Sequence, residues 1–189
     1  GNDQITLAAG SKSGLVIDGG AGTDTLTTSA GVAAYGPTSN AALQGVENIT
    51  IASTTGTNLN LANQTEAFTI TGGNGADTVT GGTGADRVNG GAGNDLFHGF
   101  AGDGTDSWAG GAGSDTISFD AVAAAVNIDL TRGTARSTTT GSDSLAGIEN
   151  ATGGLGNDTI SGSTLANGLD GGNGNDLIRG GDGADTVKG

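Results

Sequence analysis

The chain has 189 residues, of which 40 are glycine and only 3% are aromatic, so a large conventional hydrophobic core is not expected. Twenty acidic residues against six basic ones give a formal net charge of −14, which makes nucleic acids and anionic membranes poor partners. Cysteine and methionine are both absent, which excludes disulfides, zinc–thiolate sites and thiol catalysis. No apolar run approaches the roughly 18 residues of a membrane span, so we expect no membrane insertion by this segment.

A nine-residue unit recurs along the chain. It begins Gly-Gly and carries glycine at its fourth position, aspartate at its sixth and an apolar residue at its eighth. Full copies begin at Gly19, Gly72, Gly81, Gly90, Gly110, Gly153, Gly171 and Gly180. Glycines permit positive φ and close backbone approach, so the first six residues of each unit predict a turn and the last three predict a strand.

The eighth positions predict a thin ladder of stacked apolar side chains. Its members are Leu26, Val79, Val88, Phe97, Trp108, Ile117, Ile160, Ile178 and Val187. The sixth positions place one carboxylate in each turn, at Asp24, Asp77, Asp86, Asp95, Asp106, Asp115, Asp158, Asp176 and Asp185, with Asp3 in a partial copy. Carboxylates about 5 Å apart repel by roughly 1 kcal/mol in water, so stacked turns need a cation. Calcium takes six to eight oxygen ligands and fits these turns better than magnesium does.

These units resemble the nonapeptide of the RTX (repeats-in-toxin) family. The resemblance implies an all-β fold, a calcium-binding parallel β-roll or β-helix solenoid, in which two units make one coil. It implies calcium between turns on the same edge, so that Asp77 pairs with Asp95, Asp86 with Asp106, Asp95 with Asp115, and Asp158 with Asp176. The implied ligands are aspartate carboxylates and turn carbonyl groups, in Asp24, Gly72, Asn74, Asp77, Gly81, Thr83, Asp86, Gly90, Ala92, Asp95, Asp106, Gly110, Asp115, Gly153, Asp158, Gly171, Asn173, Asp176 and Asp185. We expect about four to six bound Ca²⁺ ions.

Three units depart from the pattern. The unit at residues 99–109 adds Asp103 and Gly104 before Asp106. The unit at residues 162–170 carries Asn167 in place of aspartate, and the unit at residues 10–18 has no acid in its turn. We therefore expect the turns of Asp185 and Asp24 to lack a full partner.

The repeats divide the chain into five segments. Residues 1–27 hold the first repeats, 72–118 the main block and 153–189 the final block, while residues 28–71 and 119–152 are spacers. We expect calcium-free β-coils in the first spacer, with strands at 49–51, 59–61 and 68–70, and one strand at 126–130 in the second. Both ends lie inside a repeat, so we expect a segment of a longer protein. Whether the spacers coil or loop out stays open.

Several single residues have ordinary structural interpretations. His98 falls at an outward ninth position and is expected on the surface. Phe97 and Trp108 occupy the apolar slot, which favours core packing over ligand stacking. Glu47 and Glu149 stand in nearly identical surroundings, which indicates copies of one structural device and not a glycosidase carboxylate pair.

The sequence predicts a calcium-binding structural module with no catalytic centre. By resemblance, it belongs to a secreted or cell-surface bacterial protein of the adhesin or surface-layer type, exported by type I secretion and folded by calcium outside the cell. The alternative is the non-catalytic repeat region of a secreted protease, lipase, epimerase or cytolysin, supporting folding and export. Besides calcium, the expected partners are cell-surface components or other copies of the chain, because stacked coils can meet end to end.

Overall fold

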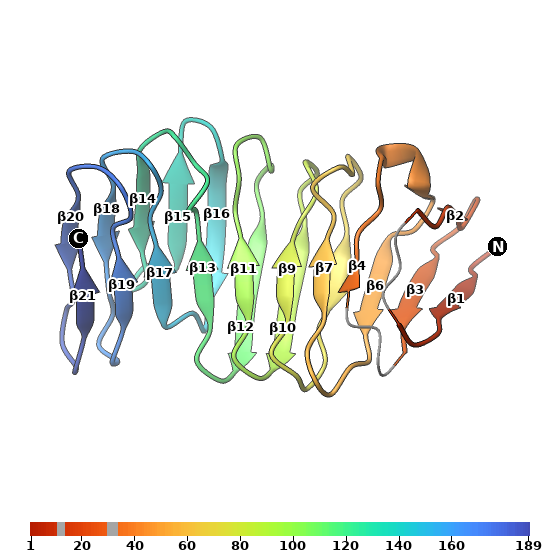
Figure 1. Ribbon diagram of the computed structural model, residues 1–189, viewed down its shortest axis with the longest axis horizontal. Helices are drawn as coiled ribbons and strands as arrows, with labels where there is room; N and C mark the ends of the chain where they lie inside the picture. Colours follow the sequence, from red (N-terminus) through yellow and green to blue (C-terminus); the bar gives the residue numbers. More distant parts are fainter. Residues whose placement is uncertain (11–13, 30–33) are drawn as a thin grey trace.

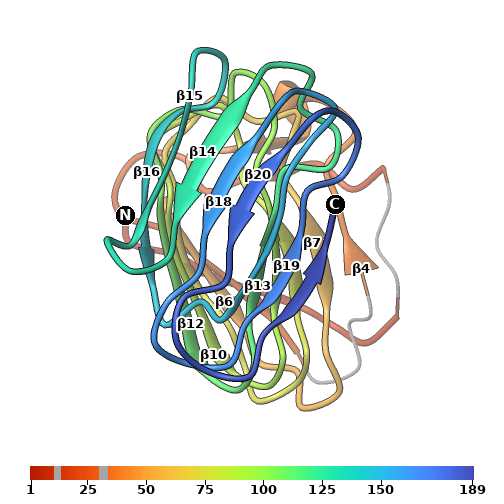
Figure 2. The same cartoon turned by 90° about the vertical axis from the view of Figure 1, so that its left-hand side faces the viewer.

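The computed structural model describes residues 1–10, 14–29 and 34–189, so residues 11–13 of the unit that begins at Gly10 and residues 30–33 of the first spacer lie outside the described part. Figure 1 shows the chain wound into a series of coils, with the two termini at opposite ends of the molecule. Figure 2 looks along this series and shows strands on two facing sides, joined by turns. The expected solenoid is confirmed.

Two large sheets make up the described part. In spatial order, the first contains β1 (Gln4–Leu7), β3 (Thr25–Thr28), β6 (Asn48–Ile51), β8 (Thr69–Thr71), β10 (Arg87–Ala92), β12 (Ser107–Ala112), β16 (Gly141–Ala146), β15 (Thr134–Ser137), β14 (Val126–Asp129), β18 (Thr159–Ser161) and β20 (Leu177–Arg179). The second contains β21 (Thr186–Lys188), β19 (Gly168–Asp170), β17 (Asn150–Thr152), β13 (Thr116–Ser118), β11 (Leu96–His98), β9 (Thr78–Thr80), β7 (Asn58–Asn60) and β4 (Ala34–Tyr35). A small sheet pairs β2 (Ile17–Asp18) with β5 (Leu43–Gln44), after the 3-10 helix η1 (Asn40–Ala42). In this described part, no helix is long and apolar enough to cross a membrane.

Most neighbouring strands are parallel and belong to successive coils. Phe97 pairs with Val79 on one side and with Ile117 on the other, so two nine-residue units make one coil. The two extra residues of the Asp106 unit are absorbed in its turn, because Val88 of the coil before still pairs with Trp108. The repeat therefore sets the register of both sheets, as a period of nine residues predicts.

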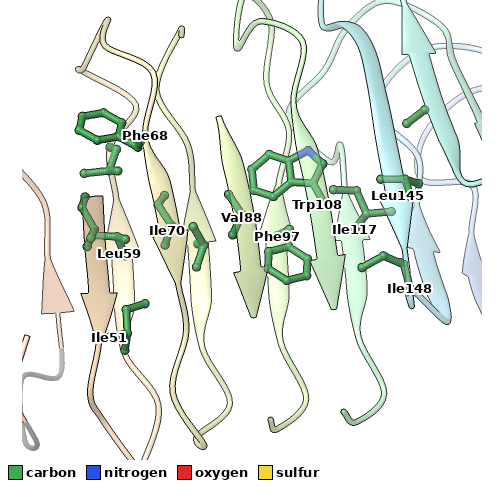
Figure 3. Packing of buried hydrophobic residues seen from close by; sticks show 14 of the residues in the cluster. Ile51, Leu59, Phe68, Ile70, Val88, Phe97, Trp108, Ile117, Leu145 and Ile148 are labelled. Atoms are coloured by element: carbon green, nitrogen blue, oxygen red, sulfur yellow. The ribbon is translucent and has the colours of Figure 1, made fainter. Parts of the chain in front are cut away.

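The core is the expected ladder of apolar side chains between the two sheets (Figure 3). Seven of the nine predicted members are at most 1% exposed: Leu26, Val79, Val88, Phe97, Trp108, Ile117 and Ile160. The rings of Phe97 and Trp108 lie 5.5 Å apart, which confirms their packing role. The prediction is wrong for Val187, which is 52% exposed, and Ile178 is only partly buried. Both lie in the outermost strands, β21 and β20, where no further coil covers them.

The first spacer continues the coils. Strands β6, β7 and β8 lie within one residue of the expected positions, and Leu59 pairs with Val79 of the main block. Ile51, Leu59, Leu61, Phe68 and Ile70 are all buried in the same core. Stacked apolar side chains thus hold successive coils together where the turns contain no aspartate.

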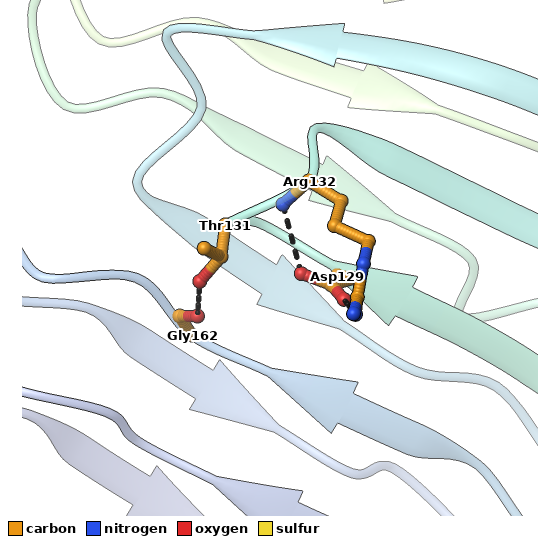
Figure 4. Close-up of polar contacts among 4 residues, drawn as sticks. All are labelled: Asp129, Thr131, Arg132 and Gly162. Atoms are coloured by element: carbon orange, nitrogen blue, oxygen red, sulfur yellow. Dashed lines mark hydrogen bonds and ion pairs between the residues drawn. The ribbon is translucent and has the colours of Figure 1, made fainter.

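The second spacer departs from a purely parallel roll. After β13 the chain runs ahead to β14, turns back through the antiparallel strand β15, and reaches β16, which lies beside β12. Figure 4 shows the turn after β14, where Asp129 accepts hydrogen bonds from the main chain and side chain of Arg132, and Thr131 donates one to the carbonyl of Gly162. Two extra strands are thereby inserted into one sheet.

Candidate metal centre

The sixth-position aspartates form two rows, one along each edge of the solenoid. In the row that precedes the eight-stranded sheet, the N–H of Asp77 donates to Oδ1 of Asp95 at 2.7 Å, and the N–H of Asp95 donates to Oδ1 of Asp115 at 2.8 Å. In the other row, Asp86 donates in the same way to Asp106, and Asp158 to Asp176, both at 2.8 Å. The four expected pairs therefore lie one coil apart on common edges.

Other residues extend the two rows. Asp24 accepts from the N–H of Asp3 at 2.6 Å, and Asp185 accepts from the N–H of Asn167 at 3.0 Å. The N–H groups of Asp24 and Asp115 donate to the Oε2 atoms of Glu47 and Glu149, at 2.7 and 2.9 Å. The two glutamates are thus copies of one structural device, and each takes the place that an aspartate holds elsewhere in the row.

The second carboxylate oxygen divides the aspartates into two classes. In Asp77, Asp86 and Asp158, Oδ2 accepts the N–H of the second glycine in the same turn, which is Gly73, Gly82 or Gly154. In a second class, Oδ2 is buried and has no hydrogen-bond partner among the described residues; its members are Asp24, Asp95, Asp106, Asp115, Asp143 and Asp176. In three stacks the first class precedes the second, because Asp77 leads to Asp95, Asp86 to Asp106 and Asp158 to Asp176.

Backbone conformation follows the same division. Gly91 and Gly93, in the turn of Asp95, have φ of 100° and 128°, whereas Gly73 and Gly75, in the turn of Asp77, are not left-handed. Left-handed φ is open to glycine at little steric cost. It lets the turn of Asp95 form without the hydrogen bond that Asp77 accepts from its own turn, so Oδ2 of Asp95 stays free.

Main-chain oxygens lie close to these free carboxylate oxygens. A side chain at Gly90 would collide with Oδ2 of Asp95, and its Cβ would lie 2.7 Å from the carbonyl oxygen of Gly110. At Gly110 a Cβ would meet Oδ2 of Asp115 and the carbonyl oxygen of Gly147. The first glycine of a unit thus leaves space for carboxylate and carbonyl oxygens to approach one another, which is the donor set that calcium prefers.

The remaining predicted carbonyl residues hold neighbouring turns in register. The N–H groups of the third-position residues Asn74, Thr83, Ala92 and Asn173 donate to carbonyl groups of the preceding coil, at 2.9–3.2 Å. Their own carbonyl groups as calcium ligands stay a prediction. Within the described residues, no three His, Cys, Asp or Glu side chains form a metal cluster, and the stacked aspartates come in pairs from adjacent turns.

Burial makes the carboxylates costly as anions. It raises the pKa of Asp77, Asp86, Asp95 and Asp115, although hydrogen bonds from main-chain N–H groups oppose this. Burial also raises the pKa of Asp106 to about 8, and the charges of Asp86, Asp103 and Asp143 add to the effect. The described ion pairs of the chain involve other acids, so a bound cation is the natural source of compensating charge.

Sequence reasoning missed two buried acids, Asp103 and Asp143. Asp143 accepts the N–H of Asp106 at 2.9 Å and so extends that row by one turn. Its unit, residues 138–146, lacks the leading glycines but keeps Gly141 fourth, Asp143 sixth and Leu145 eighth. That partial pattern was the available signal.

His98 behaves as expected, with a side chain 30% exposed and Nδ1 lying 3.7 Å from Oδ1 of Asp120.

Comparison with known proteins agrees with this geometry. The family profile of the RTX calcium-binding nonapeptide repeat matches residues 16–32, 71–105, 100–118, 144–164 and 165–189, which together cover more than half of the chain. A search of curated proteins finds no significant match. The profile thus covers all eight full units and most of the turns whose carboxylates are stacked.

Proposed function

The chain belongs to the RTX calcium-binding nonapeptide repeat family, and on this premise we propose that it is a structural module whose folding is driven by calcium binding between stacked turns. The observation that carries the proposal is the set of six buried Oδ2 atoms without a hydrogen-bond partner in the described part of the chain. A buried polar group that lacks a partner costs about 1–3 kcal/mol, and more when it is charged. Calcium ligation would remove this cost at each turn.

The net charge supports the same coupling of folding to calcium. The chain carries a formal charge of −14, and coiling brings many of its acids into two rows. Each divalent ion offsets two negative charges, and metal binding that only the folded state permits adds directly to folding free energy. The predicted ligands are the sixth-position aspartates and the turn carbonyls named above, and the free oxygens among them belong to Asp24, Asp95, Asp106, Asp115 and Asp176.

We propose further that the module works outside a bacterial cell, in a secreted or surface protein of the adhesin or surface-layer type. All-oxygen calcium modules outside cells work at about 10⁻⁴–10⁻³ M, so such a chain would stay unfolded until export. We favour this setting over the repeat region of a secreted enzyme or toxin. The coils continue through the first spacer, which joins the first repeats to the main block in one continuous rod.

Far-UV circular dichroism during a calcium titration tests the proposed function. The titration runs from chelator to about 10 mM calcium, with magnesium as the control ion, because magnesium demands a tighter octahedron. We expect a cooperative gain of β-structure with calcium alone. A β-rich spectrum in chelator that calcium does not change would contradict the proposal.

Light scattering under the same conditions tests self-association, and a strict monomer throughout would exclude it.

A further inference from the structure

The turn at residues 138–143 lies one coil beyond the turn of Asp106 and is not a recognised repeat. Besides the hydrogen bond from Asp106 to Asp143, the N–H of Gly102 donates to the carbonyl of Thr139 at 2.7 Å. This register places Asp103, from the two-residue insertion, opposite Thr140. Its last three residues, including Asp143, already belong to β16, the strand that joins the inserted hairpin to the main block.

Four oxygen atoms in these two turns are buried and have no hydrogen-bond partner among the described residues. They are Oδ1 of Asp103, Oδ2 of Asp106, Oγ1 of Thr140 and Oδ2 of Asp143. The four residues are between 0% and 2% exposed. Leaving so many buried oxygens unsatisfied in one place is costly, and three of the four come from residues that the nonapeptide pattern does not include.

The arrangement distinguishes inner from outer ligands. Asp106 and Asp143 are linked through the main chain, so their free oxygens belong to adjacent turns, as in the recognised pairs. Asp103 differs, because its Oδ2 accepts the N–H of Phe100 at 2.9 Å and fixes the side chain within its own turn. No three acids of the described residues form a metal cluster, so a site here would take two carboxylates, and Asp103, which is tied into its own turn, would be the outer one.

We propose that these two turns bind a calcium ion additional to those of the recognised repeats, held by Asp106, Thr140 and Asp143, with Asp103 as an outer carboxylate. The inference rests on the proposed function, since it assumes a chain that folds around calcium. The ion would fasten the second spacer to the main block. A groove of about 450 Å³ runs beside this edge and is lined in part by Asp86, Asp106 and Ser144.

Counting bound ions by native mass spectrometry tests the site. Asp143→Asn keeps an oxygen for the N–H of Asp106 but removes the carboxylate, and should bind one calcium ion fewer than the unchanged chain. Asp103→Asn should keep the full count at saturation but require about 10–100-fold more calcium to fill the last site, as loss of an outer-shell partner does. Asp182→Asn, the same change at an exposed acid, is the matched control and should equal the unchanged chain.

The outcomes separate this site from the proposed function. If the unchanged chain binds several ions and Asp143→Asn binds the same number, the additional site is wrong while the proposed function stands. If the unchanged chain binds none, both fall. Should Asp143→Asn fail to fold, anomalous scattering from crystals of the unchanged chain grown with Tb³⁺ decides the question. A peak between the two turns supports the site, and peaks at the recognised pairs without one here overturn it.

Discussion

The main-chain N–H of Asp115 donates a 2.9 Å hydrogen bond to Oε2 of Glu149. Glu149, in the second spacer, thus takes the next place after the row of aspartates in the main block. Asp24 and Glu47 stand in the same relation at 2.7 Å. In both cases the glutamate follows a left-handed glycine by two residues, Gly147 or Gly45, with φ of 58° and 59°. The shared sequence of the two spacers is therefore a way to end a row of aspartate turns.

Replacing Glu149 by alanine should lower the free energy of unfolding in calcium by about 0.5–1.5 kcal/mol, because the N–H of Asp115 loses its partner. Glu149→Gln keeps an oxygen at the same reach and should cost less. Urea denaturation of the three chains at one fixed calcium concentration measures the difference. Equal losses for the alanine and glutamine variants would show that the charge matters and the hydrogen bond does not.

The two classes of aspartate predict different responses to the same substitution. Asp115→Asn keeps Oδ1 for the N–H of Asp95 and removes the free carboxylate oxygen, so the calcium midpoint of folding should rise about tenfold or more. In Asp77, both carboxylate oxygens already accept N–H groups, from Thr57 and Gly73. Asp77→Asn should therefore lose about one hydrogen bond, near 1 kcal/mol, and shift the midpoint less. Calcium titrations followed by circular dichroism compare the two, and equal shifts would refute the division into classes.

The sequence predicts most of the fold because its period of nine residues can be read directly. Val79, Phe97 and Ile117 recur at the eighth position, and the structure stacks them in that order. The inserted hairpin could not be predicted, because nothing in the alternation at 126–130 shows that the next strand, β15, runs antiparallel. The direction of β15 depends on which strands the returning chain pairs with, and that pairing is a tertiary contact.

The candidate site was only partly predictable for a similar reason. The positions of Asp95 and Asp115 follow from the unit, but whether Oδ2 is free depends on the backbone conformation of the aspartate's own turn, and units of both classes carry the same glycines. Asp143 was missed because its unit lacks the leading glycines, and Glu149 was read as a structural residue but not as a member of the row, because it stands outside any unit. Both are found once hydrogen bonds between coils are known.

Removing calcium should be visible in the fluorescence of Trp108, the single tryptophan of the chain. Its side chain is 1% exposed and packs against Phe97, so a folded chain should emit at short wavelength and resist quenching by iodide. Chelator should shift the emission to longer wavelength and raise the quenching, if the coils come apart without calcium. Emission that stays unchanged through chelation would mean that the apolar ladder alone holds this part of the solenoid.

Replacing Asn167 by aspartate tests whether a calcium site can be added to the chain. Oδ1 of Asn167 accepts the N–H of Ser163 at 2.6 Å, as Oδ2 of Asp86 does for Gly82. Asn167 therefore corresponds to the first class of aspartates. Its amide nitrogen also donates to the carbonyl of Glu149 at 2.7 Å. Asn167→Asp would lose that donor and bring a second carboxylate to Asp185. The variant should therefore be less stable than the unchanged chain in chelator, by about 1–3 kcal/mol if the chain is folded there.

In calcium, the same variant should bind one more ion than the unchanged chain, because the introduced carboxylate and that of Asp185 would then form a regular pair, with carbonyl oxygens in both turns. Native mass spectrometry gives the count, and thermal unfolding with and without calcium gives the change in stability. Asn175→Asp adds the same charge at an exposed turn position and controls for nonspecific attraction of calcium. An unchanged count for Asn167→Asp would show that an aspartate at the sixth position is not sufficient, and that the left-handed turn of the following coil must adapt as well.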